Sequence, residues 1–301
     1  MKADSKLATK IGTGDFIVTA EHVPGTTASD STTKAALKAL GNKPLAINVS
    51  DNQRGVAMSS LAASVATITS GAEPVFQIVT RDRNRIALQS DLLGAASLGI
   101  KNVLCLSGHH QVLIGYPQSA NVFDVDSTQL IAMATQMSEA GVLADGARID
   151  GPFTMLIGAV ANPYLQPLEL NLLRLSKKVE AGAKFIQTHP VFDVPTFSQW
   201  LAAAHSAGLT KKTAILASVL PLESAAEAQK LRETYTDHRI PDEVINRLKA
   251  VGQNGAQKKE GLAICVEIIK KLKGMAGLRG IHILSGGREG VVPEILSAAG
   301  L

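Results

Sequence analysis

The sequence predicts an α/β protein that folds as one (β/α)8 barrel, the TIM-barrel architecture, in a single domain over residues 1–301. Eight short apolar segments recur along the chain, amphipathic segments lie between them, and no stretch has the composition of an interdomain linker. This alternation is typical of parallel α/β folds, and the chain length suits one barrel. The alternative is a doubly wound fold of two domains, but no G-x-G-x-x-G follows the first apolar segment.

The apolar segments predict strands that are buried on both faces, because they are short and mostly lack alternation between apolar and polar residues. We expect them at residues 16–21, 45–50, 75–80, 103–108, 153–160, 185–189, 214–220 and 281–286. A parallel barrel places the carboxyl ends of all eight strands at one mouth, where barrel enzymes hold their active sites.

The segments between them have apolar residues at helical spacing. They predict helices at residues 32–40, 58–70, 84–98, 127–140, 168–180, 196–207, 224–233 and 258–273. Asp82 or Asn84 is expected to cap the third of these helices. We expect an additional helix after Pro241 and a final helix at residues 292–299, and the lysines at 270–273 indicate a solvated helix face.

Composition excludes several classes of protein. With 46% hydrophobic and 19% charged residues, the chain is not a disordered protein. The chain has two cysteines, Cys105 and Cys265, which are too few and too far apart for a disulfide framework or a cysteine-ligated zinc site. This low cysteine count fits a reducing compartment. No apolar run is long enough for a secretory signal or a membrane span. We therefore expect a cytoplasmic protein with no membrane partner.

A nucleic-acid partner is not expected either. The net charge is only +4, and aromatic residues make up 4% of the chain. Single-stranded nucleic acids are bound by a basic groove together with aromatic side chains on which the bases stack. This chain has too few aromatic residues for such a platform.

Glu21 is the first candidate for chemistry, because it ends the first predicted strand. A carboxyl group that is partly desolvated at the barrel mouth has a raised pKa, as a general acid at neutral pH requires. The alternative is a structural ion pair between Glu21 and a nearby cation such as Arg81. The charged loop at residues 81–85 is expected to be a solvated rim, with a ligand contact by one arginine as the alternative.

Polar residues end other strands as well. The turn Ser107, Gly108 and His109 would let a planar ligand approach the backbone closely. His109 and His110 point to opposite faces if this segment is extended, and no metal-ligand spacing accompanies them, so no metal site is expected. His189 ends the sixth strand, where a structural and a catalytic role are both open. Residues 286–288 (Gly-Gly-Arg) follow the eighth strand, where barrels often bind phosphate.

Four blocks of the sequence, residues 48–64, 80–108, 158–163 and 181–193, form a recognisable pattern. With these blocks the chain resembles the methylenetetrahydrofolate reductase family, especially the short bacterial forms related to those of acetogens. The resemblance covers nearly the whole chain and implies a (β/α)8 barrel. It also implies a non-covalent flavin, FAD or FMN, and reduction of 5,10-methylenetetrahydrofolate to 5-methyltetrahydrofolate in one-carbon metabolism, towards methionine biosynthesis. The hydride would come from NADH, NADPH or another electron source.

The resemblance assigns roles to individual residues. Glu21 occupies the position of the family's general acid. Folate contacts would fall on His109, Gln187 and His189. Flavin contacts would fall on Ser50, Gln77, Ser107, Gly108, His109, Ala159 and Lys178. Lys178 could reach a phosphate of the cofactor as a point charge.

The sequence departs from the family pattern at two single positions and at one pair of neighbouring residues. His109 replaces an aspartate that lies near flavin and folate, and an imidazole there is expected to raise the flavin potential. His189 replaces a folate-binding glutamine, whose paired amide contacts a neutral imidazole cannot reproduce. Gly287 and Arg288 stand where related forms often carry an aromatic residue.

These departures leave other functions open. One is a folate- or flavin-binding subunit of a larger electron-transfer complex, without NAD(P)H-linked activity of its own. Another is a relative that acts on a different pterin. We also expect a homo-oligomer.

Overall fold

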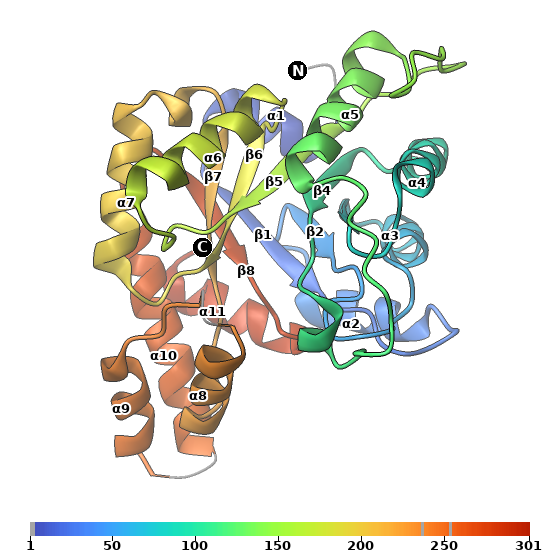
Figure 1. Ribbon diagram of the computed structural model, residues 1–301. Coiled ribbons are helices and arrows are strands. Elements are labelled where there is room, and N and C mark those ends of the chain that lie inside the picture. The colour runs from blue at the N-terminus through green and yellow to red at the C-terminus, as the bar shows by residue number, and fades with distance from the viewer. Residues whose placement is uncertain (1–3, 236–237, 253–254) are drawn as a thin grey trace.

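The computed structural model describes residues 4–235, 238–252 and 255–301, and its parallel strands form a closed barrel (Figure 1). Strand order follows the sequence, and β8 pairs with β1 to close the sheet. The strands are β1 (Ile17–His22), β2 (Ala46–Val49), β3 (Pro74–Val79), β4 (Asn102–Leu106), β5 (Leu156–Ala161), β6 (Phe185–Pro190), β7 (Ala214–Val219) and β8 (Leu278–Ile283). The predicted TIM barrel is confirmed.

Helix α1 (Lys6–Thr13) precedes the first strand, and the other helices follow strands and form the outer layer. These are α2 (Ser31–Leu40), α3 (Ser60–Thr69), α4 (Arg85–Ser97), α5 (Ser127–Ala140), α6 (Leu168–Glu180), α7 (Val194–Ser206), α8 (Ala225–Thr234), α9 (Asp242–Ala250), α10 (Gly255–Leu272) and α11 (Val292–Ala299). Short 3-10 turns are η1 (Gln111–Ile114), η2 (Leu209–Lys211) and η3 (Glu289–Val291). Asn84 caps α4, as one of the two expected residues, and its side chain accepts from the N–H groups of Ile86 and Ala87.

Most strands begin and end within one or two residues of the predicted bounds, and β5 and β8 differ most. β5 begins at Leu156 rather than at residue 153, and β8 ends at Ile283 rather than at residue 286. β8 contains Arg279 and Gly280, so an apolar run does not mark where it begins. Gly280 is needed there because a Cβ atom would lie 2.2 Å from the carbonyl oxygen of Ile17 on the neighbouring strand. Because β8 ends at Ile283, Ser285 and Gly286 belong to the loop at the barrel mouth.

Helix α1 has no counterpart in the sequence prediction. It covers the amino-terminal end of the barrel, opposite the end from which α8 and α9 project (Figure 1). The N–H groups of Lys6 and Leu7 donate to the carboxylate of Glu73, at 2.7 and 3.0 Å. This partner lies more than 60 residues away in the chain, so no local pattern announces it.

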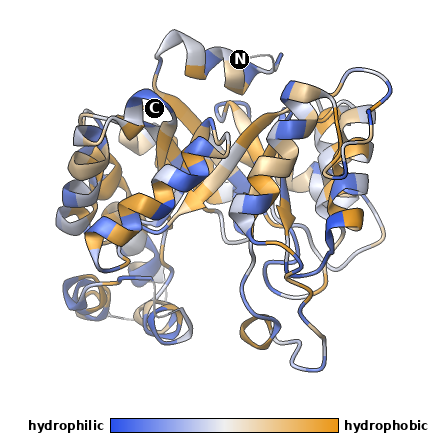
Figure 2. Cartoon of the chain, turned by 45° about the horizontal axis from the view of Figure 1, so that its top comes forward, coloured by the Kyte–Doolittle hydropathy of each residue, from blue (hydrophilic) through white to orange (hydrophobic). Residues whose placement is uncertain are grey.

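Two apolar layers hold the barrel together. An inner cluster fills its interior and contains Leu7 of α1, Leu104, Leu156, Phe185 and Leu216. In β5, Gly158 gives the Phe185 ring its space, because a Cβ atom at this position would lie 2.2 Å from the ring. A larger cluster lies between the strands and the helices, whose outward faces are mostly hydrophilic (Figure 2). No helix of the described part of the chain is both long enough and apolar enough to span a membrane.

Candidate active site

Two adjoining cavities lie at the carboxyl-terminal mouth of the barrel. The first, here called the acid cavity, has a volume of about 500 Å³ and contains Glu21 in its wall. The second, the lysine cavity, has a volume of about 650 Å³ and contains Lys178. Residues that line both are Gln53, Gln77, Leu106, His109, Val160 and His189. Volumes of this size suit small-molecule and cofactor binding.

Glu21 is the buried carboxyl group of the acid cavity. It is 1% exposed, and its Oε2 accepts a hydrogen bond of 3.3 Å from the backbone N–H of Gly286. Burial raises its pKa, while the Gly286 hydrogen bond and the charge of Arg54 oppose that shift. A carboxyl group that keeps its proton to higher pH than usual can act as a general acid.

Arg81 does not neutralise Glu21. Its guanidinium binds the carboxylate of Asp82, with Nε–Oδ1 and Nη2–Oδ2 distances of 2.6 and 2.7 Å. It also donates to the carbonyl oxygens of His109 and Asn52. Arg81 is 2% exposed, and its hydrogen bonds fix the loops after β2 and β4. The alternative of an ion pair between Glu21 and Arg81 is therefore wrong.

The turn after β4 brings His109 to the wall shared by the two cavities. Gly108 has φ +83°, and a Cβ atom there would lie 3.2–3.3 Å from side-chain atoms of Val79 and Arg81. His110 caps η1 instead and lines neither cavity, since its Nδ1 accepts from the N–H of Val112. Within the described residues no group of three or more His, Cys, Asp and Glu side chains could hold a metal ion.

Aromatic rings from the segment after α8 cover the acid cavity. The His109 and Tyr235 rings lie 4.7 Å apart, and Tyr235 lies 5.0 Å from His238. His238 meets His189 of β6 edge to face at 5.4 Å. No sequence motif predicts Tyr235 or His238 at this site, because both follow helix α8 rather than the end of a strand.

A buried polar network lies beside the acid cavity, which its members Gln187 and His282 line. The amides of Asn48 and Gln187 donate to each other, at 2.7 and 3.0 Å. Gln187 also lies 3.4 Å from the hydroxyl of Thr19, which is 2.9 Å from Nδ1 of His282. Burial lowers the pKa of His282 to about 3, so its imidazole is neutral at physiological pH. The two hydrogen bonds with Asn48 hold the Gln187 amide in place at the wall of the cavity.

The lysine cavity is rich in cations. Its lining includes Arg174, Lys177 and Lys178 of α6. Lys178 Nζ donates to the carbonyl oxygen of Val160 at 2.6 Å, and burial lowers the pKa of this ammonium group. Thr128, in the first turn of α5, faces the same cavity. Ammonium and guanidinium groups near a helix N-terminus form a donor set that suits phosphate.

Some of the residues expected at the site lie elsewhere. Ser107 and Gly108 line the lysine cavity and Gln77 lines both, but Ser50 and Ala159 line neither. Ser50 is 1% exposed, and its hydroxyl has no hydrogen-bond partner among the described residues. Ala159 packs in the layer between strands and helices, while its neighbours Val160 and Ala161 face the lysine cavity.

The Gly-Gly-Arg segment after β8 is already engaged by protein groups. The N–H of Gly286 donates to Glu21 and that of Gly287 donates to the Ser285 hydroxyl. Arg288 donates to the carboxylate of Glu227 at 2.7 Å and to the carbonyl oxygen of Pro221. These contacts position the Glu21 carboxyl group and occupy the donors that a phosphate would need.

The chain is similar in sequence to known proteins. A probable methylenetetrahydrofolate reductase (NADPH) of Caenorhabditis elegans is 24% identical over 251 residues, which are 81% of this chain and 34% of that protein. Methylenetetrahydrofolate reductase 1 of Schizosaccharomyces pombe is 26% identical over 135 residues, 44% of this chain and 22% of that protein. The chain thus spans about a third or less of the length of these relatives.

Solved structures share the fold. A Clostridium thermocellum protein that binds two copies of 5-methyl-5,6,7,8-tetrahydrofolic acid has a TM-score of 0.71 at 13% identity, over 98% of both chains. A 2,3-dimethylmalate lyase reaches 0.50 at 13% identity, over 99% of this chain and 89% of that one. The model of one family, described as methylenetetrahydrofolate reductase, matches residues 6–300. The chain belongs to the methylenetetrahydrofolate reductase family.

Proposed function

We propose that this chain reduces 5,10-methylenetetrahydrofolate to 5-methyltetrahydrofolate, with Glu21 as the general acid. The observation that carries the proposal is the buried carboxyl group of Glu21, with its raised pKa, in a ligand-sized cavity at the barrel mouth. Membership of the family supports the reaction, and the fold neighbour that binds 5-methyltetrahydrofolic acid supports a folate ligand.

Glu21 would act when the methylene bridge opens. The bond between the bridge carbon and the leaving nitrogen breaks, its electron pair stays on that nitrogen, and the carboxyl proton of Glu21 is transferred there. The remaining iminium carbon then takes a hydride and becomes the methyl group. The hydrogen bond from Gly286 fixes the Glu21 carboxyl group, so the acid is oriented before substrate binds.

The lysine cavity fits a flavin, FAD or FMN. Arg174, Lys177 and Lys178 would bind its phosphate groups, together with the first turn of α5. Gln77 and His109 line both cavities and would contact the ring system where the cavities meet. When bound, the flavin supplies the hydride, which it receives from NADH, NADPH or another donor.

The acid cavity would hold the pterin. His189 and His109 face it from β6 and from the turn after β4, and Tyr235 offers a ring on which a pterin could stack. Gln187 would reach the pterin only by giving up part of its amide pairing with Asn48. We therefore expect His189 to make the main polar contact from β6.

Product analysis tests the proposal. The purified chain is reconstituted with FAD or FMN, reduced with dithionite and mixed with 5,10-methylenetetrahydrofolate. Mass spectrometry should find 5-methyltetrahydrofolate in amounts that follow the bound flavin. A chain that binds flavin but forms no product at saturating folate would refute the reaction. Mass spectrometry of cofactor released by heat distinguishes FAD from FMN in the same preparation.

The second candidate is a flavin- or folate-binding subunit of an electron-transfer complex. The imidazole of His109 at the wall shared by the two cavities favours it, because a flavin of higher potential is a poorer reductant, so folate reduction by this chain alone would be less favourable. Activity with dithionite or viologen dyes but none with NADH or NADPH would support this alternative. Rapid NADH oxidation by the isolated chain would exclude it. Sedimentation analysis of the same sample tests the expected homo-oligomer.

A further inference from the structure

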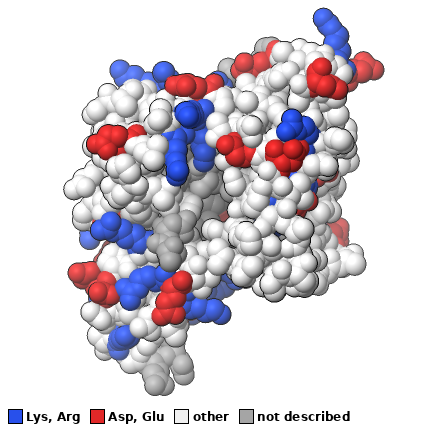
Figure 3. Space-filling model, in the orientation of Figure 1, with Lys and Arg blue, Asp and Glu red and all other residues white. Residues whose placement is uncertain are grey.

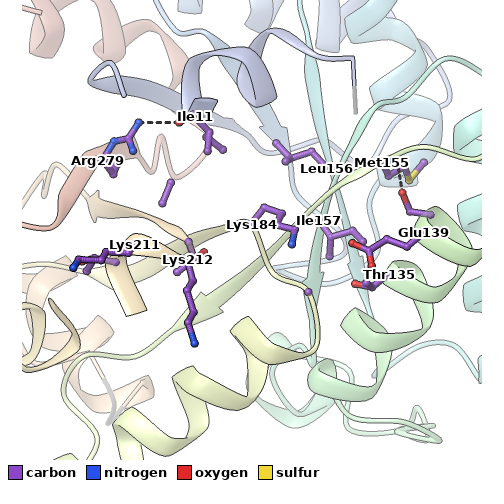
Figure 4. A pocket seen from close by; sticks show the side chains of 15 residues that line it. Ile11, Thr135, Glu139, Met155, Leu156, Ile157, Lys184, Lys211, Lys212 and Arg279 are labelled. Atoms are coloured by element: carbon purple, nitrogen blue, oxygen red, sulfur yellow. Dashed lines mark hydrogen bonds between the residues drawn. The ribbon is translucent and has the colours of Figure 1, made fainter. Parts of the chain in front are cut away.

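We propose that a third cavity, at the amino-terminal end of the barrel, binds a small molecule that carries a phosphate group. This cavity, here called the basal cavity, has a volume of about 720 Å³. It lies between α5, the start of β6, the segment around η2 and the start of β8 (Figure 4). Neither the reaction nor the flavin proposed above uses it.

Positive charge dominates the lining of the basal cavity. Among the described residues, Lys184, Lys211, Lys212 and Arg279 line it, together with one acidic residue, Glu139. In Figure 4, Lys184 extends between Lys212 on one side and Ile157 on the other. No hydrogen bond or ion pair joins the ammonium groups of the three lysines to the part of the chain that the structure describes. A multiply charged anion in the cavity would interact favourably with these groups.

Unpaired donors point to the same class of ligand. Thr213 is 4% exposed, and its hydroxyl has no hydrogen-bond partner among the described residues. The same holds for the buried hydroxyl of Thr135 and for Nε of Arg279, whose Nη2 donates to the carbonyl oxygen of Ile11. Buried polar atoms normally have partners, and an unmade hydrogen bond is costly. Phosphate oxygens accept from hydroxyl, ammonium and guanidinium groups alike.

The remaining lining is apolar and calls for an organic part on the ligand. Ile11, Met155, Leu156, Ile157 and Ala214 contribute this surface. Inorganic phosphate would leave most of the volume unfilled, whereas a nucleotide or a sugar phosphate is of suitable size. The chemistry that recognises the ligand is thus a phosphate group on a partly apolar body.

The barrel core separates the basal cavity from the active site. Leu156 and Ala214 line the basal cavity and also belong to the inner cluster, together with Leu104, Phe185 and Leu216. The interior of such a barrel is packed with side chains rather than open as a pore. Binding here therefore uses different residues from those that hold flavin and folate.

Titration calorimetry of the flavin-loaded chain tests the proposal with ADP, inorganic phosphate and adenosine as probes. ADP should bind with a Kd of about 1 mM or lower, phosphate more weakly and adenosine not measurably. Lys184→Ala and Arg279→Gln should each weaken ADP binding at least about tenfold. Lys249→Ala, an exposed lysine on α9, is the matched control and should leave it unchanged.

A further variant separates the two sites. Lys178→Ala alters the lysine cavity and should not affect ADP binding. The proposal is overturned if ADP does not bind, if adenosine binds as tightly, or if Lys249→Ala weakens binding as much as Lys184→Ala does. It is also overturned if Lys178→Ala abolishes ADP binding while Lys184→Ala does not. Circular dichroism establishes that each variant is folded, and the outcome does not depend on whether folate is reduced.

Discussion

The carboxyl group of Glu21 and the backbone N–H of Gly286 form a hydrogen bond of 3.3 Å, although 265 positions separate the two residues. Glu21 lies near the end of β1 and Gly286 follows β8, so the pairing of β8 with β1 that closes the barrel brings them together. The hydrogen bond orients the carboxyl group, and burial of Glu21 raises its pKa. Closure of the fold thus prepares the group to which we assign proton transfer.

Replacing Glu21 with glutamine should abolish most turnover but leave flavin in place. Gln keeps the size and the hydrogen bond to Gly286 but cannot deliver the proton. We expect folate reduction to fall at least about 100-fold, the usual scale for a lost general acid. Flavin absorbance after purification should match that of the unchanged chain.

The pH dependence provides a second check on Glu21. The acid must be protonated, and its pKa is raised by burial, so kcat should remain high above the usual range of a glutamate and fall as the pH rises through the raised value. Glu233→Gln, on the exposed surface of α8, is the control and should change neither the rate nor the profile. Turnover of Glu21→Gln at the normal rate would remove this residue from the mechanism.

The His109→Asp variant should have a lower flavin midpoint potential. A carboxylate at the wall shared by the two cavities destabilises the anionic reduced flavin, whereas an imidazole, neutral or protonated, does not. A dye-coupled titration under anaerobic conditions measures the change. His110→Asp makes the same substitution one residue further on, where the side chain caps η1 and lines neither cavity, and should leave the potential unaltered. An equal or higher potential in His109→Asp would contradict the charge argument.

Lys178→Met should weaken flavin binding by about 10- to 100-fold. Hydrogen bonds to charged groups contribute about 1.5–3 kcal/mol, and 1.4 kcal/mol corresponds to a tenfold change in affinity. Fluorescence titration of the apoprotein gives the dissociation constant. Lys249→Met serves as the surface control, and urea unfolding checks that loss of the Val160 contact leaves the fold intact. Unchanged flavin affinity would place the phosphate groups away from α6.

The Asn48–Gln187 pair should show strong coupling in stability. Gln187→Leu or Asn48→Leu each leaves one buried amide without its partner, and we expect a loss of about 1–3 kcal/mol in the free energy of unfolding. The double variant removes both amides, so its loss should be smaller than the sum of the two single losses. Urea unfolding of the three variants measures this. Strict additivity would show that the two amides do not depend on each other.

Much of this fold was accessible from residue patterns, because buried parallel strands are short apolar runs and the helices between them are amphipathic. Glu21 could be singled out because a strand end fixes its place at the mouth. Helix α1 could not be predicted from the sequence, because the first N–H groups of the helix bind the distant residue Glu73. The same limit applies to Tyr235 and His238, which reach His109 and His189 only through tertiary packing.

Sequence position also fails to tell which way a strand residue faces. Ala159 and Val160 are neighbours in β5, yet only Val160 lines the acid cavity, because successive side chains of a strand point to opposite faces. The loop after β8 is a second example. Its glycines suggest a phosphate site, but Gly286 donates to Glu21 and Arg288 is paired with Glu227.

The most direct measurement is the reoxidation of reduced flavin on this chain by 5,10-methylenetetrahydrofolate, followed by stopped-flow absorbance in the absence of oxygen. The account predicts that flavin absorbance returns in one phase whose rate saturates with folate, and that Glu21→Gln slows this phase at least about 100-fold. Reduced flavin that stays reduced at saturating folate, or an equally fast return in Glu21→Gln, would contradict it.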